Sequence, residues 1–417
     1  MEMRPYGRTG MQVSVLGFGC GAVGGLMVRG DPRDQQRAVA RALDAGVNYF
    51  DTAVQYGDGE SEKNLGRVLQ SLKPANVFVG TKVRLPAADR SPIADAVMKS
   101  LEASLARLQR DHVDIFYLHN SITEAGGGPA LSAQQVLGEV VPAFERLRQQ
   151  GKTRFLGLTC VGETGALAQV IDSGAFDSAQ VVYNMLNPSA AEALPANYPA
   201  QDYGRLFDHT KRAGTGVIAI RVLAGGALSG SAERRPIASP PPAPIGSALN
   251  YDADIARAQR LLSLVREGFA ASLTEAATRF AISQPAIGTI LVGMATPQQF
   301  EDSLAAVGKG PLPPAALKRL EALRQGFVGE VRLSERLQRA RCRAGLLGAG
   351  HALFGFFLAV FSATAARISA FNAFSLIFSP SRISMARRTL PSRLELKRLE
   401  GSSSAAPLAK VNFTTAL

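Results

Sequence analysis

An alternation of eight short apolar runs with amphipathic helical stretches constrains the fold of this chain more than any other feature. Each run holds five to seven residues rich in β-branched or aromatic side chains, which is typical of a buried strand. Glycines such as Gly46 and Gly151 close the helical stretches between them. The expected strands are residues 13–19, 47–51, 77–82, 113–119, 154–159, 179–184, 216–220 and 288–293, with helices between them that include 34–46, 61–72 and 93–108.

A strand that is followed by a helix pairs with the next strand in parallel, through a right-handed crossover. Eight such units predict a (β/α)8 TIM barrel, here with a non-barrel C-terminal extension. The alternation is complete near Gly326, so we assign residues 1–330 to the barrel and 331–417 to the extension. Two irregular stretches, 121–133 and 223–250, follow the fourth and seventh strands. Unless the Pro-rich part of the second is an inert linker, both would shape a binding site at the carboxyl ends of the strands.

The extension differs in kind from the sequence before it. Residues 344–366 carry no charge except a possible one on His351, and the stretch is long enough to cross a bilayer. Basic residues flank it on both sides, so the positive-inside rule gives no orientation. A membrane anchor, a helix packed on the barrel and a non-native extension all remain open. The remainder is Ser/Arg-rich and is expected to be disordered. The abrupt change in composition and the absence of Asp favour the non-native extension.

The positive charge of the chain belongs to the extension. The formal net charge is +12, but residues 331–417 hold roughly 13 Lys or Arg against 3 Glu, which leaves the barrel nearly neutral. A groove for nucleic acid in the barrel is therefore not expected.

Cysteine usage excludes two further classes. Cys20, Cys160 and Cys342 are the three cysteines, and they form no CxxC pair and no Cys/His cluster. Neither a disulfide scaffold nor a metal site is expected, and a reducing compartment fits. The N-terminus carries no apolar signal-peptide region, so we expect a cytoplasmic protein, of open oligomeric state.

Polar residues with complementary chemistry close three successive strands. Asp51 ends the second expected strand, Lys82 the third and His119 the fourth, while Tyr56 follows in the loop after Asp51. In a barrel the carboxyl ends of the strands converge on one face, where polar residues are typical of catalysis. Each residue alone would more often be structural, as a buried ion pair, a packed ring or a core histidine. The four together predict a site.

Carbonyl reduction by hydride needs exactly such groups, since a proton donor must meet the negative charge that develops on the oxygen. A tyrosine with its usual pKa of about 10 is a poor acid near neutrality. We expect Lys82 to lower the pKa of Tyr56, Asp51 to hold Lys82 charged, and His119 to orient the substrate oxygen by a hydrogen bond.

The segments "YFDTAVQYGDGESEKNLG", "VGTK" and "VDIFYLHN" resemble the aldo-keto reductase family, in order and at fitting intervals. The resemblance extends from "RTGMQVSVLGFGC" to "LVGMATPQQFEDSLAAV" and does not reach the extension. It implies a TIM barrel that binds NADPH, with NADH possible, and reduces a small carbonyl substrate. It also implies that Tyr56, Asp51, Lys82 and His119 are the catalytic tetrad, with Tyr56 as general acid.

The resemblance implies a set of cofactor contacts as well. Gln180 matches the glutamine that holds the nicotinamide carboxamide, while Thr159 and Cys160 replace the usual Ser–Asn. A thiol cannot make the hydrogen bonds of an amide. Ile220 stands where an aromatic residue usually stacks on the nicotinamide, with Arg221 next to it. Leu223 and Gly225 lie in a loop that resembles the cover of the pyrophosphate, and backbone near Gly21 borders the cofactor.

The adenosine-phosphate end resembles the family less closely. Gly293 and Thr296 begin the matching segment. Gln299 takes the place of an arginine that often grips the 2′-phosphate, and Asp302–Ser303 replace Glu–Asn. A neutral amide gives up a charge-assisted phosphate contact, so the choice between NADPH and NADH stays open.

A second dinucleotide signal is judged coincidental. "GCGAVG" at 19–24 satisfies GxGxxG after a strand, but that fingerprint requires a helix to begin at the glycines and an acid at a strand end about 20 residues on. The helix is expected only after Pro32, and Asp44 falls inside it.

The leading hypothesis is an NAD(P)H-dependent oxidoreductase that reduces aldehydes or ketones to alcohols. One alternative is a nicotinamide-binding regulatory or scaffold protein with little turnover, which the replacements at Cys160 and Ile220 would suit. Another is a barrel isomerase or lyase that uses Tyr56 and Lys82 without hydride transfer. The physiological substrate does not follow from the sequence.

Overall fold

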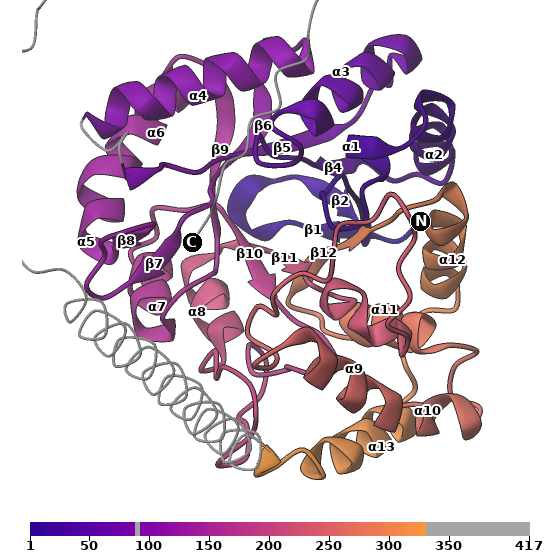
Figure 1. Cartoon of the computed structure of the whole chain (residues 1–417). Coiled ribbons are helices and arrows are strands. Elements are labelled where there is room, and N and C mark those ends of the chain that lie inside the picture. The colour runs from indigo at the N-terminus through magenta and orange to yellow at the C-terminus, as the bar shows by residue number, and fades with distance from the viewer. Residues whose placement is uncertain (88–91, 331–417) are drawn as a thin grey trace, which may run out of the picture. The chain divides into compact units, whose positions relative to one another are not determined.

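The computed structural model describes residues 1–87 and 92–330, and within them eight parallel strands close into a barrel (Figure 1). The strands follow one another around the barrel in chain order, and the last pairs with the first. The eightfold alternation of the sequence thus predicted the architecture correctly. The barrel strands are β3 (Leu16–Gly19), β4 (Tyr49–Asp51), β5 (Phe78–Val83), β6 (Val113–Leu118), β9 (Thr153–Thr159), β10 (Ser178–Val182), β11 (Gly216–Ile220) and β12 (Ile287–Gly293).

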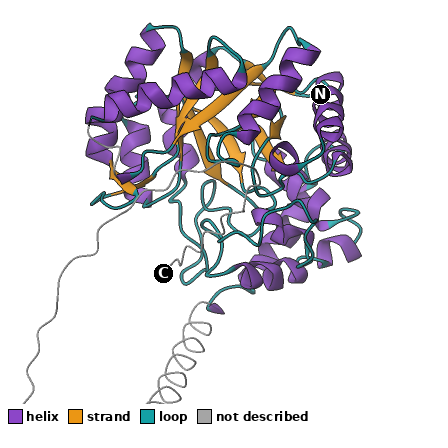
Figure 2. Ribbon diagram, turned by 45° about the horizontal axis from the view of Figure 1, so that its top comes forward, coloured by secondary structure: helices purple, strands orange, loops and turns teal. Residues whose placement is uncertain are grey.

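Helices surround the strands on the outside, as Figure 2 shows. Their apolar faces and the outer faces of the strands bury one continuous hydrophobic layer between them. The longer helices are α2 (Pro32–Asp44), α3 (Glu60–Leu72), α4 (Ile93–Leu108), α6 (Val141–Gln149), α7 (Thr164–Asp172), α8 (Leu206–Ala213), α9 (Tyr251–Arg260), α11 (Leu273–Ile282), α12 (Pro297–Gly308) and α13 (Pro314–Gln325). Shorter turns of helix are α1 (Leu26–Arg29), α5 (Ala133–Gln135), α10 (Ser263–Arg266), a π-helical turn at Val136–Val140, and 3-10 turns at Gly7–Thr9 and Ala224–Ser229.

The first expected strand, 13–19, is two strands in the structure. β2 (Gln12–Ser14) pairs antiparallel with β1 (Met3–Pro5), and the barrel strand β3 begins only at Leu16. The break follows from Ser14, whose hydroxyl donates to the Leu16 carbonyl at 2.8 Å and whose backbone N–H donates to Asn48 Oδ1. Such side-chain bonds to the backbone compete with a strand ladder.

The β1–β2 hairpin lies across the amino end of the barrel. Tyr6, at the turn of the hairpin, is fully buried and bonds through its hydroxyl to Ser178 at the start of β10. Arg8 N donates to the Gly214 carbonyl just before β11, at 2.8 Å. The hairpin therefore closes the amino end, and Tyr6 joins the apolar residues inside the barrel.

Two buried tyrosines fill the middle of the barrel. The hydroxyls of Tyr49 and Tyr117 are 2.9 Å apart, and Tyr117 also bonds to Ser178 Oγ at 2.8 Å. Gly157 on β9 makes room for them, because a Cβ there would overlap the ring of Tyr117. The interior is thus a packed core and not a pore.

The two irregular stretches do lie at the carboxyl ends of β6 and β11. The first contains a small parallel ladder between β7 (Ser121–Thr123) and β8 (Ala130–Ser132), which the sequence did not predict. The second crosses to the loop after β3, where Ser239 N donates to the Val23 carbonyl at 3.0 Å. We call residues 223–250 the strap.

The assignment of 331–417 as an extension and the apolar stretch 344–366 lie outside the described residues, so both stay predictions. Within residues 1–87 and 92–330, the structure has no helix of the length and apolarity needed to span a membrane.

Candidate active site

Four of the predicted site residues come together at the carboxyl end of the barrel. Asp51 is the last residue of β4, Lys82 lies near the end of β5, and His119 follows β6 directly. Tyr56 lies between β4 and α3, and its hydroxyl folds back to Lys82. Adjacent parallel strands carry these groups, so the barrel itself fixes their spacing.

The Lys82 ammonium is at the centre of the group. Its Nζ donates to the Asp51 carboxylate, to the Thr52 carbonyl at 2.8 Å and to the Tyr56 hydroxyl at 3.2 Å. An ammonium has three donors, so all of them are used. Lys82 is fully buried, and the ion pair with Asp51 compensates its charge.

Burial and pairing act on this ion pair in opposite directions. Burial tends to lower the pKa of Lys82, but Asp51 and Tyr56 outweigh it, so the pKa of Lys82 is raised. Burial raises the pKa of Asp51, while Lys82 and Gln180 act to lower it. We assign a charged pair, because both carboxylate oxygens accept hydrogen bonds, one from Lys82 and one from Gln180.

The predicted direction of the net pKa shift of Tyr56 was wrong: the pKa is raised and not lowered. Burial raises the pKa of the phenol, and Lys82, although it acts to lower the pKa, does not outweigh the burial. The physical reason is that a phenolate loses more hydration in the barrel than one ammonium at 3.2 Å restores. Tyr56 is therefore protonated near neutrality and can give up a proton only to a strong acceptor.

His119 lies beside the phenol and is neutral. The two rings meet edge to face, with centroids 6.2 Å apart and planes at 89°. Burial, then the charges of Lys82 and Arg84, lowers the pKa of His119 to about 3. Its Nδ1 lies 3.3 Å from Gln55 Oε1, so the Gln55 side chain selects the tautomer.

Gln180 and Thr159 lie at the same end of the barrel and differ in what their polar atoms do. The amide of Gln180 donates to Asp51 Oδ2 at 2.5 Å, so it belongs to the same network as Lys82. The Thr159 hydroxyl is buried and has no hydrogen-bond partner among the described residues. A buried hydroxyl without a partner is costly, and an added carboxamide would satisfy it.

Cys160 follows Thr159 and is fully buried. Burial alone raises the pKa of its thiol, and burial is also the first cause of the raised pKa of Cys20. Both thiols are therefore protonated and poorly reactive, which argues against control of the site by oxidation at Cys160.

The residues expected beside the nicotinamide and the pyrophosphate lie at the end of β11 and in the turn that follows it. Ile220 ends the strand and is half-buried; Leu223 packs against the core. Arg221 has a left-handed backbone, with φ of 56°, and its carbonyl accepts from Asn184 Nδ2 at 2.9 Å. Gly225 has φ of 70°, which an L-residue rarely adopts, so a glycine is required in this turn of the strap.

The residues expected at the adenosine phosphate surround the start of α12, and their polar groups are used locally. Thr296 caps the helix, Gln299 Oε1 accepts from Ala295 N at 2.7 Å, and the Ser303 hydroxyl donates to the Gln299 carbonyl at 2.9 Å. Asp302 is exposed and accepts from Gln298. Gly293 ends β12 just before this turn.

The GxGxxG match has a structural explanation. A Cβ on Gly24 would overlap the backbone of Met294, so this glycine lets the loop after β3 pack on the loop after β12. Gly21 is half-buried in the same loop, beside the strap. α2 begins at Pro32 and includes Asp44, as expected, although the single-turn α1 before it was not predicted.

Three residues at the site were missed by sequence reasoning. Gln55 contacts His119, and Thr52 supplies a carbonyl to Lys82. Both belong to the same stretch as Asp51 and Tyr56, "DTAVQY", so proximity in the sequence was a usable signal for them. Arg84, two residues after Lys82, carries no motif and would not have been found.

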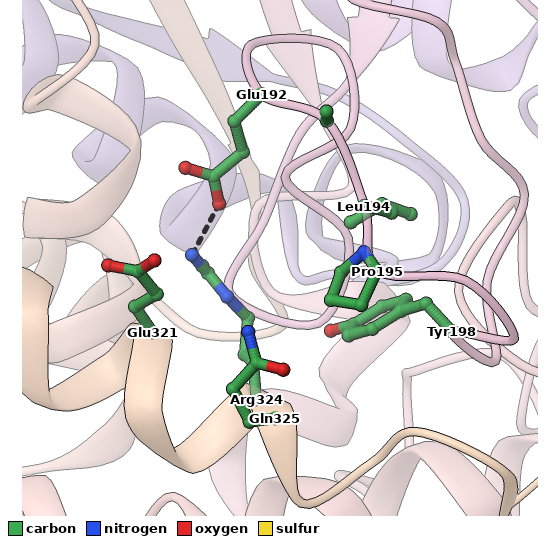
Figure 3. Close-up of a pocket in the computed structure, with 8 residues that line it drawn as sticks. Glu192, Leu194, Pro195, Tyr198, Glu321, Arg324 and Gln325 are labelled. Atoms are coloured by element: carbon green, nitrogen blue, oxygen red, sulfur yellow. Dashed lines mark hydrogen bonds and ion pairs between the residues drawn. The ribbon is translucent and has the colours of Figure 1, made fainter.

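A cavity of about 380 Å³ lies elsewhere, between the loop after β10 and α13 (Figure 3). Arg324 forms its floor and pairs with Glu192 across it. None of the residues that line this cavity belongs to the group at the strand ends, so the cavity is separate from the candidate active site. Besides this pair, its lining is Ala193, Leu194, Pro195, Tyr198, Glu321 and Gln325.

The fold and the strand-end group define a class of barrel oxidoreductase, and comparison with known proteins places the chain in it. Residues 15–325 match the model of the aldo/keto reductase family, well over half of the chain. The chain belongs to the aldo/keto reductase family.

The individual proteins that this chain resembles share less than a third of its sequence. L-galactose dehydrogenase of Arabidopsis thaliana is 29% identical over 309 residues, which are 74% of this chain and 88% of that protein. Pyridoxal 4-dehydrogenase of Microbacterium luteolum is 26% identical over 73% of this chain and 92% of that one. The holo form of an aldo-keto reductase from Bacillus halodurans has a TM-score of 0.58 at 24% identity, covering 78% of this chain and 96% of its own, which shows a shared fold.

Proposed function

We propose that this protein reduces aldehydes or ketones to alcohols, with Tyr56 as the general acid. One observation carries the proposal: the Tyr56 hydroxyl, whose pKa is raised by burial, lies 3.2 Å from the ammonium of a buried Lys82–Asp51 pair. Family membership supports an oxidoreductase, because aldo-keto reductases use nicotinamide cofactors.

The roles of Tyr56, Lys82 and His119 follow from the charge that each of them carries. A carbonyl oxygen that accepts from the Tyr56 hydroxyl becomes strongly basic only as negative charge develops on it, and at that point it can take the phenolic proton. The phenolate left behind faces Lys82, which stabilises it. His119 is neutral and adds no charge beside the same oxygen. Its one ring proton faces Gln55 Oε1 from Nδ1, so a hydrogen bond from Nε2 to the substrate requires the Gln55 amide to turn and donate to Nδ1.

A nicotinamide cofactor supplies the hydride when it is bound. Thr159 and Gln180 would hold its carboxamide, and the unsatisfied Thr159 hydroxyl supports this assignment. Ile220 would pack against the ring in place of an aromatic residue, and Leu223 and Gly225 of the strap would cover the pyrophosphate. Gln299 offers no charge to a 2′-phosphate, so both NADPH and NADH are kept as candidates.

Two of the proteins named above are called dehydrogenases, a name given to enzymes that remove hydride from their substrate. The same groups serve both directions, since the acid that protonates the alkoxide in reduction is the base that deprotonates the alcohol in oxidation. We therefore expect oxidation of the product alcohol by this protein as well.

The test is loss of NADPH or NADH absorbance by the full chain with a panel of simple aldehydes and ketones, beside Tyr56→Phe. Tyr183→Phe is the matched control, because it also removes one buried phenol hydroxyl but lies between the barrel and α11, stacked on Phe280. Turnover that collapses in Tyr56→Phe and survives in Tyr183→Phe supports the proposal. Tight cofactor binding without turnover in the unmodified protein would point instead to a regulatory role.

A further inference from the structure

Arg221 has an unusual position for an arginine of this protein. It follows β11 at the carboxyl end of the barrel and is half-buried. Among the described residues, the other arginines that are not exposed donate hydrogen bonds to carboxylates, amides or carbonyls, whereas the Arg221 guanidinium has neither a hydrogen bond nor an ion pair. None of its five donors is committed to another group of the described residues, so all of them are available to a ligand.

The backbone holds this side chain in place at a cost. A left-handed conformation is uncommon for a residue other than glycine and is found where surrounding contacts enforce it. Here Asn184 Nδ2 and Ala224 N both donate to the Arg221 carbonyl, at 2.9 and 2.7 Å. The strain therefore fixes the direction in which the guanidinium leaves the chain.

The guanidinium turns inward, under the strap. A Cβ on Gly225 would lie 3.0 Å from its Nη1, so the missing side chain leaves room for it. Burial lowers the pKa of Arg221, while Tyr56, Asp254 and Tyr203 act to raise it, so these three groups surround the guanidinium at the carboxyl end of the barrel. It lies on the opposite side of the barrel end from Arg84, whose charge acts on His119.

Other unmet polar atoms belong to the same surroundings. The Tyr203 hydroxyl and Asp254 Oδ1 are buried and have no hydrogen-bond partner among the described residues. Asp254 is not the ion-pair partner of Arg221; its nearest cation is Arg257, at 4.0 Å, and Ser247 donates to its other oxygen at 2.6 Å. The Arg221 guanidinium is thus free to bind a ligand group that accepts hydrogen bonds, and an unpaired buried phenol lies in its surroundings.

We propose that Arg221 binds a carboxylate carried by the substrate, so that the preferred substrates are aldehydes or ketones that also bear an acid group. This inference rests on the proposed function, since it places the carbonyl at Tyr56 and the carboxylate at Arg221. A guanidinium pairs with a carboxylate through two parallel hydrogen bonds, which fix orientation as well as charge. The phosphates of the cofactor are the competing source of anionic oxygens.

The experiment compares substrates that differ only in this charge: 4-carboxybenzaldehyde against methyl 4-formylbenzoate, and 4-oxobutanoate against its methyl ester. The unmodified full chain should show kcat/KM at least about tenfold higher for each acid. Arg221→Gln should lower the acid-to-ester ratio by about 10- to 100-fold, the size of a charge-assisted pair, mainly through KM. Arg221→Lys should restore part of it.

Arg235→Gln is the matched control. Arg235 is an exposed residue of the strap, so the change removes the same charge without touching the guanidinium that faces Tyr56. The ratio should stay within about twofold of the unmodified protein if local binding, and not the general field, is responsible.

The dissociation constant of the cofactor, measured without substrate, distinguishes a substrate carboxylate from a cofactor phosphate as the anion that Arg221 binds. An unchanged ratio with weaker cofactor binding in Arg221→Gln would assign the guanidinium to the cofactor phosphates and overturn the proposal. An unchanged ratio with lower thermal stability would make it a countercharge for Asp254, which also overturns it. If Arg221→Gln does not fold, the unmodified protein still decides, because turning over the esters as well as the acids is incompatible with the proposal. Turnover of neither acid nor ester would instead count against the proposed function.

Discussion

The Lys82 ammonium lies 3.2 Å from the Tyr56 hydroxyl while it also donates to the Asp51 carboxylate, so a phenol and an ion pair share one buried cation. The charges of Lys82 and Asp51 compensate each other, which is why both can be buried beside the Tyr56 phenol. The carboxylate keeps the lysine charged, and the lysine in turn is the group that would receive a phenolate.

Replacing Lys82 with Met should unfold the protein more readily as well as stop turnover. The substitution leaves the Asp51 charge buried without its cation, which costs about 3–5 kcal/mol in comparable pairs. The double variant Lys82→Met/Asp51→Asn removes both charges and should recover part of the stability but none of the activity. Urea denaturation of the three proteins measures this, and a double variant no more stable than the single one would show that the pair is not coupled.

Stability should fall in acid through His119. Its folded pKa is about 3, and an unfolded histidine titrates near 6.5, so between these values the unfolded chain binds a proton that the folded protein does not. The contribution is fully present above about pH 6.5 and is lost as the pH falls toward 3. The unfolding free energy of the unmodified protein should therefore drop, relative to that of His119→Gln, between pH 7 and pH 4.5. Parallel curves would contradict the shift.

Introducing a cation at the start of α12 should select NADPH. Gln299→Arg places a guanidinium where the helix N-terminus already favours an anion, and the ratio of kcat/KM for NADPH over NADH should rise by about tenfold or more. Gln298→Arg adds the same charge one residue earlier, at an exposed position, and should change the ratio much less. Equal effects would mean that residue 299 does not face the 2′-phosphate.

Two glycine substitutions should have opposite effects on stability. Gly157→Ala puts a methyl group into the ring of Tyr117 in the packed barrel and should cost about 2 kcal/mol or more. Gly138→Ala lies in a helical turn with open space around the new Cβ and should stabilise by about 0.5–1 kcal/mol. Thermal melting of both variants tests the interior packing, and a neutral Gly157→Ala would contradict it.

The eight strands could be predicted from the sequence because each is an apolar run bounded by turn residues, a local property. The break inside 13–19 could not, since it depends on a bond between Ser14 and Asn48 across two strands. The β7–β8 ladder was missed for the same reason: three-residue strands have no pattern of their own, and pairing alone creates them.

The sequence predicted which side chains meet at the candidate site, because strand topology alone brings them together. It did not predict the properties of these side chains that depend on burial. Asp51, Lys82 and His119 end neighbouring strands, so parallel pairing brings them together whatever surrounds them. The direction of the Tyr56 pKa was wrong because the loss of hydration around the phenol is a tertiary property. The bond from Gln180 to Asp51 joins strands that are not neighbours in the barrel and has no local signal.

The hairpin that carries Tyr6 across the amino end has a consequence for how ligands enter and leave the barrel. With that end closed by Tyr6 and the interior filled by Tyr49 and Tyr117, a ligand of the candidate active site can enter only from the carboxyl end. Two ligands that bind through a single opening cannot bind and dissociate independently. The ligand that lies deeper binds first and dissociates last. The order in which two ligands bind and leave would then be set by the packed interior and the closed amino end, which no ligand contacts.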